Sequence, residues 1–325
     1  MNAPLSGKLR TWAVAVVIAA MAIAGAACAA GEPTGTQSDQ PTPGPLAEPA
    51  HNWTVVSDDL YATFATPDLA VGRQRVALVL NDGIGLISFP IVNVSSYYYP
   101  GGFDDEAQRE GPVETATAQF HEFPLGTRGI HVANMEFDRV GDWSVEARVP
   151  RPDGSISIVE IRFPVASETR SVDAGERPPA SRNRTLADTG GDVSALTTGS
   201  LHAPDLYRLT VAEALDIGRP FVVVFASPAF CTNAVCGPQV EVASELQETY
   251  GDQADFIHVD LYENPQEIQG DLSKAIVTPL LDEWGLVSQE WTYVVDHTGT
   301  VTARFENFVG KSELEEAIQA ALANG

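Results

Sequence analysis

Positive charge is scarce in this sequence. Among 325 residues, Lys and Arg together number 19 against 44 Asp and Glu, so the formal net charge at pH 7 is −25. A surface this acidic repels the phosphates of nucleic acids and the anionic headgroups of lipids. The composition therefore argues against DNA or RNA as a partner. It is typical of a well-solvated surface or, as the alternative, of one that attracts a cationic partner.

The apolar run near the N-terminus falls short of a membrane-spanning helix. It covers residues 12–27 and is rich in alanine, whereas a spanning helix needs about 20 predominantly apolar residues. Lys8 and Arg10 precede the run, and positive charge followed by an apolar stretch of this length is typical of a signal peptide. We therefore expect residues 1–28 to direct export.

Cysteine is also rare, with three in the whole chain, and the first of them ends the apolar run. The sequence Gly25-Ala26-Ala27-Cys28 resembles the lipobox of bacterial lipoproteins, in which the cysteine is lipidated and becomes the first residue. That resemblance implies lipidation of Cys28 and anchoring at the cell membrane on the extracytoplasmic side. Gly25 stands where the family usually carries Leu, so ordinary cleavage in this region is the alternative. Residues 29–50 are rich in Gly, Pro, Ser and Thr, which predicts a flexible tether.

The other two cysteines are Cys231 and Cys236. An exported protein occupies a compartment in which disulfides persist. Two neighbouring cysteines in such a protein are expected to form a disulfide or to bind a metal.

Residues 51–167 are predicted to form an all-β domain of about seven short strands. Apolar and polar residues alternate over 142–149, and the turn sequence Pro152-Asp153-Gly154 leads into a further strand over 155–165. Residues 137–146 resemble the closing hairpin of bacterial Ig-like modules, which implies an Ig-like β-sandwich. No catalytic group of residues stands out here, so interaction or spacing is its expected role. His121 and His131 lack neighbouring Met or Cys and predict no metal site.

A Pro-, Gly- and Ser-rich linker is predicted over residues 168–200, followed by an α/β domain over 201–325. A capping-box pattern opens a helix at Thr210, and the apolar run 221–226 is typical of a strand buried on both faces. The cysteines follow this strand. After them we expect a helix over 239–250, strands over 256–260, 291–296 and 301–305, and a last helix over 312–322.

This order of elements around the two cysteines resembles the thioredoxin fold, and in particular that of membrane-anchored thiol-disulfide oxidoreductases. The resemblance implies disulfide exchange with extracytoplasmic protein thiols or disulfides, without a cofactor. Its implied catalytic residues are Cys236 and Cys231. The implied substrate groove comprises Phe230, Pro238, Glu290 and Trp291.

The spacing of the cysteines departs from the usual family motif, because four residues separate them instead of two. In a regular helix, five steps give a rise of about 7.5 Å and side chains roughly 140° apart, which is incompatible with a disulfide. Cys231 must therefore precede the helix. In the favoured alignment Cys236 takes the place of the first family cysteine, attacks from the helix N-terminus, and is resolved by Cys231. In the alternative alignment Cys231 attacks.

Two further departures leave other functions open. The family's cis-proline is missing at Glu290 and Trp291, and the strand before the cysteines carries no acid, so Glu290 is the candidate for proton transfer by its position. One alternative is a Sco-type copper-binding chaperone, since two thiolates suit Cu(I) and His258 or His297 is a possible third ligand. The other is a redox-inert binding protein with a structural disulfide.

Overall fold

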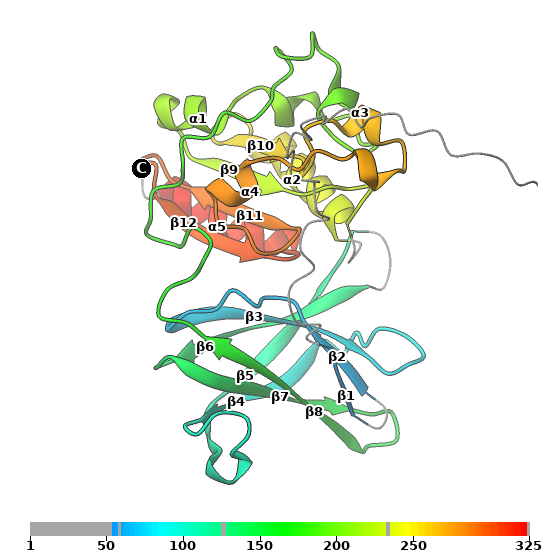
Figure 1. Cartoon of the computed structure of the whole chain (residues 1–325), viewed down its shortest axis with the longest axis vertical. Helices are drawn as coiled ribbons and strands as arrows, with labels where there is room; N and C mark the ends of the chain where they lie inside the picture. The colour runs from blue at the N-terminus through cyan, green and yellow to red at the C-terminus, as the bar shows by residue number, and fades with distance from the viewer. Residues whose placement is uncertain (1–53, 58–59, 125–127, 232–234, 324–325) are drawn as a thin grey trace, which may run out of the picture. The chain divides into compact units, whose positions relative to one another are not determined.

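The computed structural model describes residues 54–57, 60–124, 128–231 and 235–323 (Figure 1). The predicted signal peptide, Cys28 and the predicted tether lie outside these residues. Within the described part of the chain, no helix is both long and apolar enough to cross a membrane. These described residues belong to one compact unit.

The first part of the described chain forms one eight-stranded antiparallel sheet in the order β1-β2-β3-β6-β5-β4-β7-β8 (Figure 1). The all-β prediction is confirmed; an Ig-like sandwich stays a prediction, since all eight strands pair into a single sheet. The strands are β1 (Thr54–Ser57), β2 (Leu60–Phe64), β3 (Gly72–Asn81), β4 (Ile91–Tyr99), β5 (Glu110–Glu122), β6 (Gly129–Phe137), β7 (Gly141–Pro150) and β8 (Ile156–Val165).

Alternation along β7 shows why these residues form a sheet with a buried face. Trp143, Val145, Ala147 and Val149 are each at most 1% exposed, because side chains two apart along a strand lie on the same face. They belong to a core cluster with residues from each strand from β2 to β8, both included.

The segment predicted as a linker is irregular and well packed. Its one regular element is a short 3-10 helix, η2 (Val193–Ala195). Ser171, Ser181 and Asn183 are at most 5% exposed, so this segment is held against its neighbours at these points. Its polar groups take up backbone partners, as where the Asn183 side chain bonds the backbone of Val211 and Leu209.

The last part of the chain contains a four-stranded sheet in the order β10-β9-β11-β12 (Figure 1). Strand β10 runs parallel to β9, whereas β11 and β12 form an antiparallel hairpin beside β9. This arrangement confirms the thioredoxin-like prediction for this part of the chain. The strands are β9 (Phe221–Phe225), β10 (Asp255–Val259), β11 (Trp291–Val295) and β12 (Val301–Glu306), and the two long helices are α2 (Cys236–Tyr250) and α5 (Lys311–Ala323).

Both faces of β9 are covered, as its continuous apolar run predicted. Val222 and Val224 pack into the cluster that contains α2 and α5. Phe221, Val223 and Phe225 pack into a second cluster with α1 (Val211–Ile217) and α4 (Leu280–Glu283). A strand fixed on both faces holds its carboxyl end in place, and the cysteine loop starts there. The short elements α3 (Pro265–Ile268), η1 (Glu106–Gln108), η3 (Pro204–Tyr207) and η4 (Leu272–Lys274) complete the fold.

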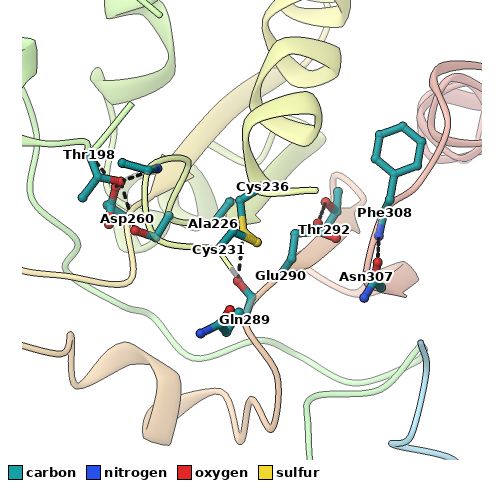
Figure 2. Close-up of a disulfide and its surroundings, with 12 residues drawn as sticks. Thr198, Ala226, Cys231, Cys236, Asp260, Gln289, Glu290, Thr292, Asn307 and Phe308 are labelled. Carbon is teal, nitrogen blue, oxygen red and sulfur yellow. Dashed lines mark hydrogen bonds between the residues drawn. A yellow bond between two sulfur atoms is a disulfide. The ribbon is translucent and has the colours of Figure 1, made fainter. Parts of the chain in front are cut away.

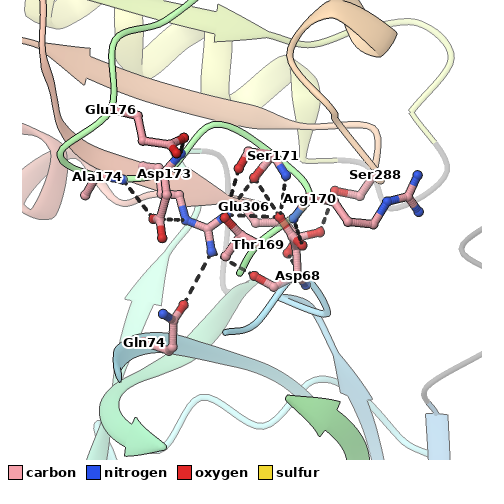
Figure 3. A network of polar contacts seen from close by, with 11 residues as sticks. Asp68, Gln74, Thr169, Arg170, Ser171, Asp173, Ala174, Glu176, Ser288 and Glu306 are labelled. Carbon is pink, nitrogen blue, oxygen red and sulfur yellow. Dashed lines mark hydrogen bonds and ion pairs between the residues drawn. The ribbon is translucent and has the colours of Figure 1, made fainter. Parts of the chain in front are cut away.

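A buried ion pair joins the loop after β2 to strand β12 (Figure 3). Arg304 Nη1 lies 3.1 Å from Asp68 Oδ2, and the two side chains are 11% and 6% exposed. Ser171, from the segment predicted as a linker, donates its hydroxyl to the same carboxylate oxygen at 2.6 Å. Arg75 of β3 adds a second link by binding both carboxylate oxygens of Glu313 in α5. The eight-stranded sheet is thus bonded directly to the thioredoxin-like part.

Candidate functional site

Cys231 and Cys236 form a disulfide with their Cα atoms 5.9 Å apart, within the usual range of about 4.4–6.8 Å. Helix α2 begins at Cys236, so Cys231 precedes the helix, as the spacing required. Three of the four intervening residues, 232–234, lie outside the described residues.

The two cysteines differ in exposure. Cys236 is 0% exposed and belongs to the core cluster with Val240 and Ala243, whereas Cys231 is half-buried and packs against that cluster. Cys236 sits in the first turn of a 15-residue helix whose N-cap, Val235, makes no side-chain hydrogen bond to it. The positive end of the helix dipole therefore acts on the buried sulfur, and it favours a thiolate there once the disulfide opens.

The loop before β11 forms the wall beside the disulfide (Figure 2). Cys236 Sγ lies 3.6 Å from the carbonyl oxygen of Gln289. In the disulfide form the sulfur has no hydrogen to donate, so the two atoms are only in contact. After reduction, the Cys236 thiol can donate a hydrogen bond to this carbonyl oxygen. The next residue is Glu290, and the peptide bonds on both of its sides are trans, since the cis peptide bond among the described residues is at Gly111–Pro112.

Glu290 is a buried carboxyl group, and one of its two oxygens has no hydrogen-bond partner among the described residues. It is 1% exposed, and its Oε1 accepts from the Thr292 hydroxyl at 3.3 Å. Its Oε2 has no hydrogen-bond partner among the residues that the structure describes. Burial raises the pKa of Glu290 to about 8, against a lowering by the charge of Arg75. The group is therefore mostly protonated at pH 7 and can give up a proton locally.

A second buried acid, Glu306, holds the loop that contains Gln289. Its Oε1 accepts from the Ser288 hydroxyl at 2.8 Å, and its Oε2 accepts from the backbone N–H of Asp68 at 3.0 Å. Burial raises the pKa of Glu306 as well, and the neighbouring Asp68 adds to that rise. The loop beside the disulfide is thereby connected to the eight-stranded sheet.

The four predicted groove residues divide into two pairs. Phe230 is half-buried with its ring edge-on to Tyr262 at 5.9 Å, and Pro238 is half-buried in the first turn of α2. Glu290 and Trp291 lie in the interior, at 1% and 0% exposure; Trp291 begins β11, whose five residues are all buried, and Glu290 directly precedes it. Only the first pair presents side chains at the surface beside Cys231.

The two candidate histidine ligands differ in their surroundings. Both ring nitrogens of His258 have partners, Nδ1 with the Tyr207 hydroxyl at 2.7 Å and Nε2 with the Ala226 carbonyl at 3.0 Å. Burial lowers the pKa of His258 to about 4, so the ring is neutral. His297 is exposed in the turn after β11. Among the described residues, no group of three or more His, Cys, Asp or Glu side chains is arranged to hold a metal ion.

One polar cluster below the cysteine loop was missed by sequence reasoning. It joins Asp260, Thr198 and Ser227, and Figure 2 shows Thr198 and Asp260 on one side of the disulfide. A signal was present: Ser227 and Asp260 each follow a strand of the parallel pair β9 and β10, and the carboxyl ends of parallel strands meet at one edge of a sheet. Thr198 carried no such signal.

Comparison with known proteins finds no matching family model and no matching curated protein. Among solved structures, the chain is similar to a putative thiol:disulfide interchange protein DsbE from Chlorobium tepidum, at 14% identity over 47% of this chain and 99% of that one, with a TM-score of 0.34. It is similar to a thioredoxin family thiol:disulfide interchange protein from Chlorobium tepidum TLS, at 16% identity over 35% of this chain and 86% of that one, with a TM-score of 0.28. A thioredoxin-like protein in the oxidized form, in solution, is 20% identical over 46% of this chain and 97% of that one, with a TM-score of 0.29.

Proposed function

We propose that this protein exchanges disulfides with thiols of extracytoplasmic proteins, and that Cys231 meets the partner while Cys236 is the resolving cysteine. The observation that carries the assignment is the unequal burial of the pair: Cys236 is 0% exposed and Cys231 is half-buried. A partner thiolate must reach the sulfur that it attacks. This assignment agrees with the alternative alignment, in which Cys231 attacks, and replaces the favoured one, in which Cys236 attacks.

The reaction begins from the disulfide seen in the structure. A partner thiolate attacks Cys231 Sγ and forms a mixed disulfide, while the Cys231–Cys236 bond breaks and its electron pair stays on Cys236. The protonated Glu290 gives its proton to the departing Cys236 thiolate. A second partner thiolate then attacks the partner's sulfur in the mixed disulfide, and Cys231 leaves as a thiolate. The partner ends with a disulfide and this protein with two reduced cysteines; the same steps in reverse reduce a partner disulfide.

Glu290 supports this chemistry through its burial and its place in the chain. Its backbone adjoins Gln289, whose carbonyl oxygen touches Cys236 Sγ, and its Oε2 is unpartnered among the described residues. A raised pKa of about 8 lies near that of a thiol, so a proton passes between the two groups at little cost in free energy.

The location and the first domain belong to the same proposal. Residues 1–28 direct export, Cys28 carries the lipid anchor, and the Ig-like module over 51–167 serves interaction or spacing. Loss of fatty-acid labelling on Cys28→Ala in a bacterial host, with labelling retained on Cys231→Ala, is the expected result. Equal labelling of the two variants would contradict the anchor.

Trapping tests the exchange function and its assignment together. With Cys236→Ser, a mixed disulfide between Cys231 and a partner cannot be resolved. The probe is a peptide whose cysteine is disulfide-bonded to a small leaving-group thiol: the Cys231 thiolate attacks the peptide sulfur, the small thiol leaves, and the peptide accumulates as a covalent adduct. With Cys231→Ser, the buried Cys236 forms little adduct. If Cys231→Ser gives the larger adduct, the roles are reversed. A wild-type potential below about −300 mV without insulin-reductase activity would mark the pair as a structural staple.

A further inference from the structure

A buried carboxylate directly follows β10 and is linked through Thr198 to the segment that leads to Cys231. Asp260 is 5% exposed. Its Oδ2 accepts from the backbone N–H of Thr198 at 2.6 Å and from the Thr198 hydroxyl at 2.8 Å. Its Oδ1 accepts from the backbone N–H of Tyr262 at 3.2 Å. Three donors fix the carboxylate in one orientation, and the carboxylate fixes Thr198.

The Thr198 hydroxyl connects Asp260 to the cysteine loop. Because the Thr198 hydroxyl donates its hydrogen bond to Asp260, its oxygen can accept hydrogen bonds from other groups. The backbone N–H of Ala229 donates to it at 3.3 Å, and the Ser227 hydroxyl lies 2.9 Å away. Both residues belong to the segment between β9 and Cys231. One hydroxyl therefore ties that segment to the end of β10.

Close packing secures the same segment from the side. A Cβ atom on Gly199 would lie 3.0 and 3.1 Å from two ring atoms of Pro228, which means that the backbone at Gly199 is already against the proline. The backbone N–H of Phe230 donates to the Ser227 carbonyl at 3.1 Å and closes a turn. The turn that delivers Cys231 is thus clamped between residues 198–199 and its own hydrogen bond.

We propose that Thr198 and Asp260 are positioning residues that hold Cys231 against Cys236 and thereby set the reduction potential of the disulfide. The proposal rests on the proposed exchange function of this pair. The stability of a disulfide increases with the effective concentration of its two thiols. A loop held in one conformation raises that concentration because it keeps the two thiols close together. Thr198 lies in the segment predicted as a linker, so the redox site extends beyond the predicted thioredoxin-like domain of residues 201–325.

Substitutions at Thr198, made in the full chain, test the clamp. Thr198→Val keeps the branched shape and removes the hydroxyl, whereas Thr198→Ser keeps the hydroxyl. We expect Thr198→Val to lower the equilibrium constant for disulfide formation against a glutathione or dithiothreitol buffer about tenfold, equivalent to a potential about 30 mV less negative. Thr198→Ser is expected to stay within about twofold of wild type, because its hydroxyl makes the same bonds.

The chain offers a matched control in the same segment. Thr185 donates its N–H and hydroxyl to Asp188 Oδ2 at 2.7 and 2.9 Å, the same pattern as Thr198 and Asp260, but within residues 185–188. Thr185→Val should leave the potential unchanged. A shift in Thr185→Val equal to that in Thr198→Val would overturn the proposal, since any loss of a threonine bond would then have the same effect.

A second variant tests the same role in case Thr198→Val folds poorly. Gly199→Ala adds a Cβ atom against Pro228 and displaces the loop while Thr198 stays intact, so the reduction potential should again become less negative. An unchanged potential in both variants contradicts the positioning role. The outcomes also separate the two proposals. If Thr198→Val changes the reduction potential but the wild-type protein has no exchange activity, the exchange function is refuted and the positioning role of Thr198 stands. If the wild-type protein exchanges disulfides but Thr198→Val leaves the potential unchanged, the positioning role is refuted and the exchange function stands.

Discussion

The Sγ atom of Cys236 lies 3.6 Å from the carbonyl oxygen of Gln289, across the space between the first turn of α2 and the loop before β11. The contact ties the buried half of the disulfide to a loop whose next residue is the protonated acid Glu290. The site is therefore asymmetric. One sulfur is near the surface, whereas the other is buried between the Gln289 carbonyl group and the N-terminus of α2.

Glu290→Gln should slow disulfide exchange at pH 7 about tenfold, because the amide cannot protonate the departing Cys236 thiolate. The ratio of wild-type to variant rates should fall as pH rises through about 8, where the Glu290 carboxyl loses its proton. Exchange rates with a small dithiol, measured from pH 6 to 9.5, provide this ratio. Glu267→Gln, at an exposed position in α3, is the control. A ratio that is constant with pH would remove Glu290 from proton transfer.

The same substitution should stabilise the fold above neutral pH. The pKa of Glu290 is raised by burial to about 8 from an ordinary value of 4.5. The unfolded chain therefore loses this proton at lower pH than the folded chain does, and stability falls as pH rises from about 4.5 to 8. Glu290→Gln removes that loss. Urea unfolding should show a gain at pH 8 that exceeds the gain at pH 5 by roughly 3 kcal/mol. A loss of stability at pH 8 would contradict the assigned protonation.

Alkylation of the reduced protein should distinguish the two cysteines. Cys231 is half-buried and Cys236 is 0% exposed, so iodoacetamide should modify Cys231 at least about tenfold faster in the folded state, because a thiolate reacts only where the reagent reaches it. Mass spectrometry of peptides after timed quenching measures both rates. In urea the two rates should converge. Faster modification of Cys236 in the folded protein would reverse the assignment of roles.

The parts that the sequence predicted well are those where periodicity and burial decide the structure. The run from Phe221 to Phe225 forms a strand buried on both faces, because five apolar residues in sequence leave no face for solvent. Cys231 precedes α2 because helix geometry forbids a disulfide across five residues. Local patterns of this kind need no knowledge of the partners.

The parts that the sequence did not predict depend on residues that meet only in the fold. Thr198 and Asp260 lie 62 positions apart, and neither belongs to a repeating pattern. Whether Cys231 or Cys236 is exposed depends on how the loop packs, which the spacing alone leaves open. Glu290 was noticed by position, but its burial, which raises its pKa, depends on how the loop before β11 packs in the fold.

The ion pair between Asp68 and Arg304 gives a test of how firmly the eight-stranded sheet is joined to the thioredoxin-like part (Figure 3). Arg304→Met leaves the Asp68 carboxylate buried without its cation, which typically costs about 3–5 kcal/mol. The remaining donors, the N–H groups of Arg170 and Ser171 and the Ser171 hydroxyl, reduce the expected loss to about 2–3 kcal/mol.

A double-mutant cycle with Asp68→Asn separates the pair from its surroundings. Because the neutral amide needs no cation, Arg304→Met should cost about 1 kcal/mol or less in the Asp68→Asn background. Chemical denaturation followed by tryptophan fluorescence measures all four proteins, and Arg73→Met, whose ion pair with Glu114 has its Arg side chain 59% exposed, is the control. An equal cost of Arg304→Met in both backgrounds would show that Arg304 acts through its other contacts, with Asp173, Ser171, Gln74 and the Asp68 carbonyl, and not through the Asp68 charge.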